Sequence, residues 1–311
     1  MSKTAFLFPG QGSQSVGMMT DLAAGSDLVR ATFDEASEVL GYDLWSLAGQ
    51  GPEERLNQTQ VTQPALLAAG IATWRVWCDR GGRAPEFMAG HSLGEYTALV
   101  AAGALDFSDA IALVAQRGEM MQAATPAGSG AMAAVLGLDD DVLAAVCAQA
   151  SAVGIVSCAN FNSPGQIVIA GERAAVERAC ELAGEAGARR AVPLAVSVPS
   201  HCALMAPAAE GMQAALAATD VRAPRIPVLH NVDTQARSEP DAIRAALVEQ
   251  LYRPVRWADT IRKMADDGVE RMAECGPGRV LAGLNRRISR DLETVALVSP
   301  ETVEQTVEQW S

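Results

Sequence analysis

A serine stands at the centre of the pentapeptide Gly90-His91-Ser92-Leu93-Gly94, which fits the pattern G-x-S-x-G. In this pattern a sharp turn between a strand and a helix exposes the serine hydroxyl as a nucleophile. Residues 86–90 predict a short strand, and residues 95–102, rich in Ala, Leu and Val, predict a helix. The alternative is an ordinary Gly/Ser turn that caps a helix. The flanking elements favour a nucleophilic Ser92, with the main-chain N–H of Leu93 directed at a developing oxyanion.

A serine hydroxyl needs a base to attack near neutral pH, and histidine is the usual one. The chain has three histidines, at positions 91, 201 and 230. His91 adjoins Ser92, and neighbouring side chains on a tight turn diverge, whereas His230 ends a predicted strand and fits a packed or capping histidine. His201 lies where a predicted inserted domain rejoins the rest of the chain, and such a junction forms a natural cleft. We therefore favour His201 as the base.

The chain offers no evident carboxylate to complete a triad with these residues. Between Ser92 and His201 the carboxylates, such as Asp139–Asp141 and Glu172, stand at expected helix starts. A backbone or amide carbonyl is then expected to accept the hydrogen bond from the imidazole Nδ1, which predicts a Ser–His dyad. Cys202 follows His201 directly but lacks an activating turn or base of its own, so we do not favour it as a nucleophile.

Arg117 occupies an expected helix over residues 108–124 and borders its apolar stripe near Val114. A desolvated guanidinium needs an anion. One interpretation is a salt bridge with a carboxylate such as Glu95 or Glu119. The other is that Arg117 grips the carboxylate of a substrate through two hydrogen bonds. The pattern alone leaves both open.

The pattern of strands and helices divides the chain into two domains. One stretch predicts strand 131–136, helix 139–150, strand 155–160, strand 166–170, helix 172–185 and strand 191–196, the β-α-β-β-α-β order of a ferredoxin-like unit. Around it, short buried strands at 4–8, 86–90, 226–229, 269–273 and 294–298 alternate with helices, which indicates an α/β domain with mainly parallel strands. We expect a large domain over residues 1–128 and 198–311, with a small domain over 129–197 inserted into it.

The composition excludes several classes of protein. With 311 residues, 49% hydrophobic and 20% charged, the chain is typical of a globular protein with a large core. A net charge of −13 would repel a nucleic-acid backbone. No apolar run reaches the ~20 residues that cross a bilayer, and the start lacks a signal-peptide layout, so we expect a cytoplasmic protein. The six cysteines form no C-x-x-C pair and predict reduced thiols rather than a metal site.

Further motifs stand in a specific order along nearly the full length. They are Phe8-Pro9-Gly10-Gln11-Gly12-Ser13-Gln14, Thr62-Gln63-Pro64-Ala65, Gly90-His91-Ser92-Leu93-Gly94-Glu95, Gln116-Arg117-Gly118, Val198-Pro199-Ser200-His201, Gln250-Leu251-Tyr252-Arg253-Pro254-Val255-Arg256-Trp257 and Glu274-Cys275-Gly276-Pro277-Gly278. With these motifs the chain resembles the malonyl-CoA:acyl carrier protein transacylases of bacterial type II fatty acid synthesis. The resemblance implies an α/β-hydrolase-like large domain with a ferredoxin-like insert.

The resemblance also implies roles for individual residues. Ser92 would be acylated to a malonyl ester, and His201 would act as general base and then as the acid that protonates the leaving thiolate. Gln11 and Leu93 would form the oxyanion hole through their main-chain N–H groups. Gln250 would hold His201 through a carbonyl, which agrees with the missing triad acid.

The implied substrates are malonyl-CoA and the phosphopantetheine thiol of an acyl carrier protein, used in turn by ping-pong kinetics without a cofactor or a metal. Arg117 would bind the malonyl carboxylate. An acidic carrier protein is implied as the partner, and since the net charge is −13, docking would need a local basic patch. The candidates are Arg189, Arg190, Arg286, Arg287 and Arg290.

Three alternatives remain at this level. A generic serine esterase would share Ser92 and His201 but has no use for Arg117 as a clamp. A non-catalytic module would bind carrier protein without forming a Ser92 ester. A malonyl transferase of polyketide synthesis or of a malonate decarboxylase would share the whole site. Monomer is the expected oligomeric state.

Overall fold

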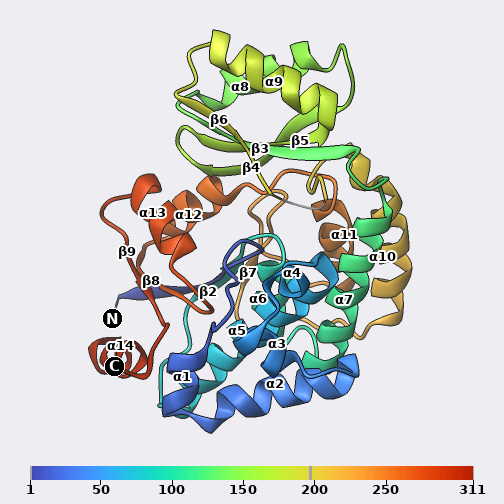
Figure 1. Ribbon diagram of the computed structural model, residues 1–311. Coiled ribbons are helices and arrows are strands. Elements are labelled where there is room, and N and C mark those ends of the chain that lie inside the picture. Colours follow the sequence, from blue (N-terminus) through green and yellow to red (C-terminus); the bar gives the residue numbers. More distant parts are fainter. Residues whose placement is uncertain (1, 196–197, 311) are drawn as a thin grey trace.

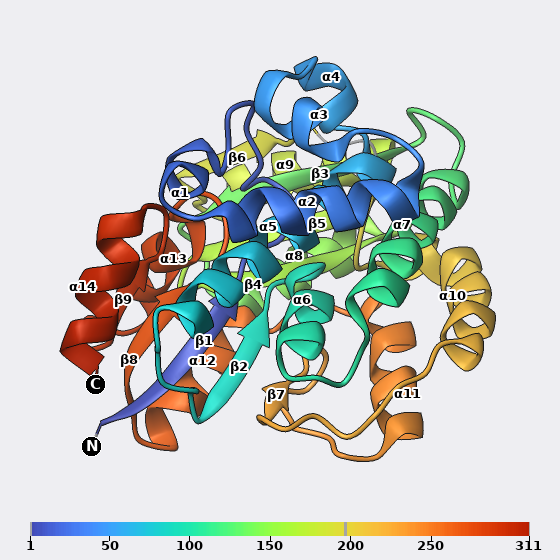
Figure 2. The same cartoon turned by 90° about the horizontal axis from the view of Figure 1, so that it is seen from below.

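The computed structural model describes residues 2–195 and 198–310, which form two sheets with separate layers of helices (Figure 1). The larger sheet has five strands in the order β7-β2-β1-β8-β9, and every neighbouring pair is parallel. Its strands are β1 (Lys3–Phe8), β2 (Phe87–Gly90), β7 (Val228–Leu229), β8 (Val269–Glu274) and β9 (Glu293–Ala296). β1 lies at the centre, between β2 and β8, and the three strands are seen side by side in Figure 2.

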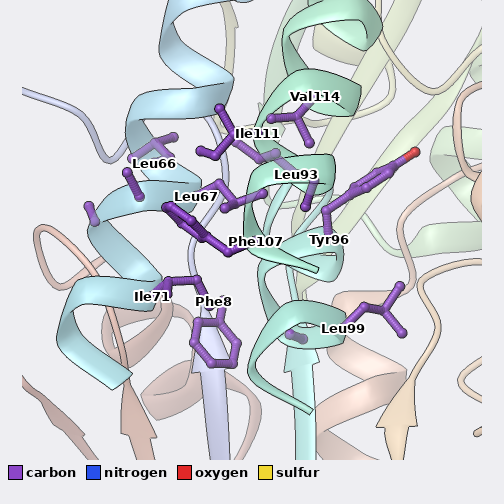
Figure 3. Close-up of a cluster of buried hydrophobic side chains, with 14 of the residues drawn as sticks. Phe8, Leu66, Leu67, Ile71, Leu93, Tyr96, Leu99, Phe107, Ile111 and Val114 are labelled. Carbon is purple, nitrogen blue, oxygen red and sulfur yellow. The ribbon is translucent and has the colours of Figure 1, made fainter. Parts of the chain in front are cut away.

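Helices cover both faces of this sheet, as a parallel sheet requires. Alternate residues of β1 enter different cores: Phe6 and Phe8 pack with one set of helices, Ala5 and Leu7 with another. The first core, shown in part in Figure 3, includes side chains of α5, α6 and α7. The helices outside the small sheet's segment are α1 (Thr20–Gly25), α2 (Asp27–Leu40), α3 (Leu44–Gln50), α4 (Glu53–Leu56), α5 (Thr59–Asp79), α6 (Gly94–Ala101), α7 (Phe107–Ala123), α10 (Ala206–Ala218), α11 (Pro240–Gln250), α12 (Trp257–Asp266), α13 (Val280–Ile288) and α14 (Pro300–Trp310), with a 3-10 turn at Ala203–Met205. In the described residues no helix is both long and apolar enough to span a membrane.

The smaller sheet is antiparallel, with strand order β4-β5-β3-β6. Its strands and helices follow one another as β3 (Gly130–Leu136), α8 (Asp140–Ala150), β4 (Val156–Ser163), β5 (Gln166–Glu172), α9 (Arg173–Glu185) and β6 (Arg190–Pro193). α8 and α9 cover one face, and the other face is turned toward the larger sheet (Figure 1). The predicted fold class, a parallel α/β domain with a β-α-β-β-α-β insert, is confirmed. The predicted boundaries at 128/129 and 197/198 stay predictions, and positions 196 and 197 lie outside the described residues.

Some elements differ from the sequence-based expectation. α5 begins at Thr59, five residues before the expected start at Pro64, because a proline near a helix start removes only one intrahelical hydrogen bond. The predicted strand 191–196 is assigned as Arg190–Pro193. Three helices, α1, α3 and α14, were not predicted. α14 buries few side chains, Val303, Thr306 and Trp310 among them, so its apolar stripe is narrow and its sequence looks polar.

Candidate active site

The turn that carries Ser92 depends on both glycines of its motif. Ser92 follows the last residue of β2, precedes α6 and has a left-handed φ of 52°, a strained conformation for a residue other than glycine. A Cβ on Gly90 would lie 1.8 Å from the carbonyl carbon of Gly94, and a Cβ on Gly94 would lie 2.0 Å from the carbonyl oxygen of Phe8. The turn is therefore closed by backbone contacts that no larger residue permits.

His201 is the histidine that reaches the serine. Its Nε2 lies 2.7 Å from Ser92 Oγ, and its Nδ1 lies 2.7 Å from the main-chain oxygen of Gln250, at the end of α11. Because a carbonyl can only accept, Nδ1 carries the proton and Nε2 is free to accept the serine proton. The arrangement is a Ser–His pair oriented by a neutral carbonyl rather than by a carboxylate.

The surroundings keep His201 unprotonated. The residue is almost fully buried, with 3% of its surface exposed. Burial lowers the pKa of His201 to about 3, and the positive charge of Arg117 lowers it further in the same direction, against the hydrogen bond to Gln250. A neutral imidazole is the form that can take a proton from Ser92.

Two main-chain N–H groups face the reaction centre without an internal acceptor. Gln11, in the loop after β1, and Leu93, at the start of α6, both line the cavity that contains Ser92 and His201. Among the described residues, neither main-chain N–H donates a hydrogen bond. Unused donors at the carboxyl edge of a parallel sheet, beside a nucleophile, can hold a developing oxyanion.

Arg117, on α7, presents a buried positive charge to the same cavity. Its Nη1 donates to Gln63 Oε1 at 2.7 Å and its Nη2 to Gln250 Oε1 at 3.0 Å, while Nη2 lies 3.4 Å from Ser92 Oγ. Both amide oxygens are neutral, and within the described residues Arg117 forms no ion pair with a carboxylate. Burial lowers the pKa of Arg117, since the charged form loses solvation. The guanidinium is thus held in place with its charge still available to an anion.

The two carboxylates considered as partners of Arg117 are engaged or distant. Glu119 is exposed on α7. Glu95 accepts hydrogen bonds from His230 Nδ1, the main-chain N–H of Asn231 and Gln250 Nε2. The geometry therefore favours an external anion over an internal salt bridge.

The cavity lies between the two sheets and has a volume of about 520 Å³. The small sheet contributes apolar side chains, Met132 from β3 and Val168 from β5, while Met121 and Val198 line it from the rest of the chain. Apolar walls around one guanidinium and one activated serine suit a small acyl group that ends in a carboxylate.

The other candidate groups lie apart from this reaction. His91 Nε2 is 2.8 Å from Asn162 Oδ1, and its ring packs against Trp257 at 5.6 Å between centroids. His230 is fully buried against Glu95. Cys202 is buried, donates to the Pro199 carbonyl at 3.2 Å, and has its pKa raised to about 11 by burial. Neither His91 nor His230 contacts Ser92 Oγ.

Sequence reasoning missed the polar residues that support the site. Gln63 was quoted only as part of a motif, yet its amide oxygen holds Arg117. Asn231 carried no signal of its own, yet its Oδ1 accepts from the main-chain N–H of Ser92 at 2.7 Å and its Nδ2 donates to the Gly90 carbonyl at 2.7 Å. Its place directly after β7, at the carboxyl edge of the sheet, was the available hint.

Comparisons with known proteins agree on one kind of relative. The family described as "Acyl transferase domain" matches residues 5–306. The malonyl CoA-acyl carrier protein transacylase of Escherichia coli strain K12 is 55% identical over 308 residues, which covers 99% of this chain and 100% of that protein. The crystal structure of an acyl carrier protein S-malonyltransferase from Vibrio cholerae is 56% identical, covers 98% of this chain and 100% of its own, and has a TM-score of 0.96. A malonyl-transacylase solved in complex with its type II PKS acyl-carrier protein is 54% identical, covers 99% and 100%, and has a TM-score of 0.98.

Proposed function

Since this chain belongs to the malonyl CoA-acyl carrier protein transacylases, within the acyl transferase family, we propose which of its residues perform the transfer. The enzyme is an [acyl-carrier-protein] S-malonyltransferase that moves a malonyl group from malonyl-CoA to a carrier protein in fatty acid synthesis. In our proposal Ser92 is the nucleophile, His201 the general base and acid, Gln11 and Leu93 the oxyanion hole, and Arg117 the carboxylate clamp.

The observation that carries these assignments is the position of the Arg117 guanidinium. It is buried, bound to neutral amide oxygens, and 3.4 Å from the hydroxyl of Ser92, which itself lies 2.7 Å from a neutral histidine. A malonyl thioester has its carboxylate two carbons from the reacting carbonyl. One cavity of this size can therefore hold the carboxylate on Arg117 and the thioester carbonyl at Ser92.

The first half-reaction forms the acyl-enzyme. Ser92 Oγ attacks the thioester carbon while His201 Nε2 takes the hydroxyl proton. The negative oxygen of the tetrahedral intermediate receives hydrogen bonds from the N–H groups of Gln11 and Leu93. The carbon–sulfur bond then breaks, and His201 gives its proton to the departing CoA thiolate. A malonyl ester on Ser92 remains.

The second half-reaction repeats these steps in reverse with a new thiol. The phosphopantetheine thiol of the carrier protein gives its proton to His201 Nε2 and attacks the ester carbon. Collapse releases Ser92, which recovers the proton from His201. CoA and the carrier protein share the pantetheine arm, so the same opening can admit both, which predicts ping-pong kinetics.

The carrier protein is the macromolecular partner. A similar malonyl-transacylase was solved with its type II PKS acyl-carrier protein bound. For this chain the proposed docking residues are the exposed arginines of β6 and α13 and their flanks, Arg189, Arg190, Arg286, Arg287 and Arg290. Arg287 donates to Gln166 at the start of β5, so this group spans both sheets. A monomer acting in the cytoplasm completes the proposal and rests on the sequence alone.

The choice of acceptor separates this function from that of a serine esterase. We expect malonyl-enzyme, formed with malonyl-CoA and freed of excess donor, to be discharged by the carrier-protein thiol far faster than by water. Intact mass against time, with and without carrier protein, measures both rates. Discharge at one rate regardless of the thiol would contradict the transferase assignment.

The pH dependence follows from the environment of His201. Burial, and second the charge of Arg117, hold the pKa of His201 at about 3 instead of 6.5, so the base stays unprotonated as the pH falls through 6.5. We expect kcat/KM for malonyl-CoA, which reports the free enzyme, to lose activity only well below pH 6.5. In Arg117→Ala, assayed with acetyl-CoA, the acid limb should move to higher pH because one cause of the lowering is gone. A wild-type limb centred near 6.5 would contradict this account.

A further inference from the structure

A fully buried carboxylate, Glu95 in the first turn of α6, lies behind the reaction centre. Its Oε1 accepts from His230 Nδ1 at 2.6 Å, and its Oε2 accepts from the main-chain N–H of Asn231 at 2.9 Å and from Gln250 Nε2 at 2.9 Å. The mechanism above gives Glu95 no task. Its partners, however, lead directly to Ser92 and Arg117.

The side chain of Gln250 joins Glu95 to the guanidinium. Gln250 Nε2 donates to Glu95 Oε2 and to the main-chain oxygen of Ser92, both at 2.9 Å, while its Oε1 accepts from Arg117 Nη2 at 3.0 Å. The two ends of a side-chain amide have nearly the same shape, so hydrogen bonds decide which end faces which neighbour. Glu95 can only accept. It therefore requires the NH₂ end and leaves the oxygen for Arg117.

Asn231 joins Glu95 to the nucleophilic turn. The Glu95 carboxylate holds its main-chain N–H, and its side chain bonds both the N–H of Ser92 and the carbonyl of Gly90, each at 2.7 Å. The peptide groups of Ser92 are thus fixed on both sides, by Asn231 at the N–H and by Gln250 at the carbonyl. This support falls on a residue with a left-handed backbone, where it is needed most.

The amide between the two charges has a further consequence. Burial lowers the pKa of Arg117, while the negative charge of Glu95 acts in the opposite direction and helps keep the guanidinium charged. A carboxylate in direct contact would occupy the guanidinium and compete with the substrate. With the neutral amide of Gln250 interposed, Arg117 keeps the hydrogen-bonding geometry and remains open to an anion.

We infer that Glu95 is a positioning residue for malonyl transfer, which orients the Gln250 amide toward Arg117 and, through Asn231, secures the turn of Ser92. The inference rests on the proposed function, since it concerns the same site. It assigns to the side chain of Gln250 a task separate from that of its main-chain carbonyl, which holds His201.

Three variants test the inference, each compared with wild type for kcat/KM with malonyl-CoA and with acetyl-CoA. Glu95→Met removes the acceptors, and Gln250→Met removes the amide but keeps the main-chain carbonyl. Glu95→Gln is the matched control, because its side-chain oxygen can still accept from Gln250 Nε2 and the N–H of Asn231. The malonyl-to-acetyl ratio is the readout, since general damage to the fold lowers both values together.

We expect the ratio to fall about tenfold or more in Glu95→Met and Gln250→Met, the loss typical of one hydrogen bond to a charged group. Glu95→Gln should keep the ratio within about threefold, a rescue by the hydrogen-bonding variant. An unchanged ratio in folded Glu95→Met and Gln250→Met would overturn the inference, and so would equal losses in Glu95→Gln and Glu95→Met. If Glu95→Met does not fold, as judged by its thermal melt, Gln250→Met decides alone. A wild type without malonyl preference would instead overturn the proposed function.

Discussion

Replacing His201 with alanine should slow the acylation of Ser92 by ~10²–10⁴. The reason is the single 2.7 Å contact between His201 Nε2 and Ser92 Oγ, which is the available route for the serine proton. Without it the hydroxyl must attack in its protonated form. The rate is measured as single-turnover release of CoA from malonyl-CoA.

His91→Ala is the informative comparison for that variant. His91 adjoins the nucleophile and lines the same cavity, but its Nε2 is bound to Asn162 and not to the serine. Its loss should slow acylation much less than the loss of His201. A near-normal rate in His201→Ala, together with a large defect in His91→Ala, would reverse the assignment of the base.

Replacing Arg117 with alanine should lower kcat/KM for malonyl-CoA by about 10²-fold or more, the effect of removing one partner of a buried charge pair. Loading with acetyl-CoA should rise relative to malonyl-CoA, because an acetyl group leaves a buried guanidinium without an anion whereas alanine imposes no such cost. The measurement is the ratio of kcat/KM for the two donors.

Arg117→Lys is the matched control for the clamp. Lysine keeps a positive charge but not the planar pair of nitrogens that binds Gln63 Oε1 and Gln250 Oε1, so selectivity should fall between wild type and Arg117→Ala. A malonyl-to-acetyl ratio that is the same in all three proteins would remove Arg117 from the carboxylate site.

The sequence was most informative where local pattern and chemistry coincide. The run 4–8 and the motif at 90–94 predicted a strand and a strand–turn–helix, which the structure has as β1 and as β2 followed by α6. The β-α-β-β-α-β order likewise follows from alternating short patterns along one stretch of chain. These features depend on neighbours in sequence, which is why pattern reasoning reaches them.

The supporting network could not be predicted for the opposite reason. Glu95, Asn231 and Gln250 come from α6, the turn after β7 and the end of α11, and nothing in their local sequence indicates that their amides and carboxylate meet. The same holds for Gln63 and Arg117, which the packing of α5 on α7 brings together. Elimination among three histidines pointed to His201, but the 2.7 Å contact with Ser92 required the fold.

The domain boundaries and the docking arginines remain predictions for a related reason. The strands of the small sheet lie between Gly130 and Pro193, inside the predicted range 129–197, but the last two positions of that range lie outside the described residues. Arg286 and Arg290 are exposed, and surface exposure alone does not identify a partner's contact.

The central claim is that Ser92 carries a malonyl ester selected by its carboxylate. The most direct measurement is the intact mass of wild type and of Ser92→Ala after brief incubation with malonyl-CoA and, separately, with acetyl-CoA. The account predicts a malonyl adduct on wild type, none on Ser92→Ala, and little or no acetyl adduct on either. A malonyl adduct that persists in Ser92→Ala, or none on wild type, would contradict it.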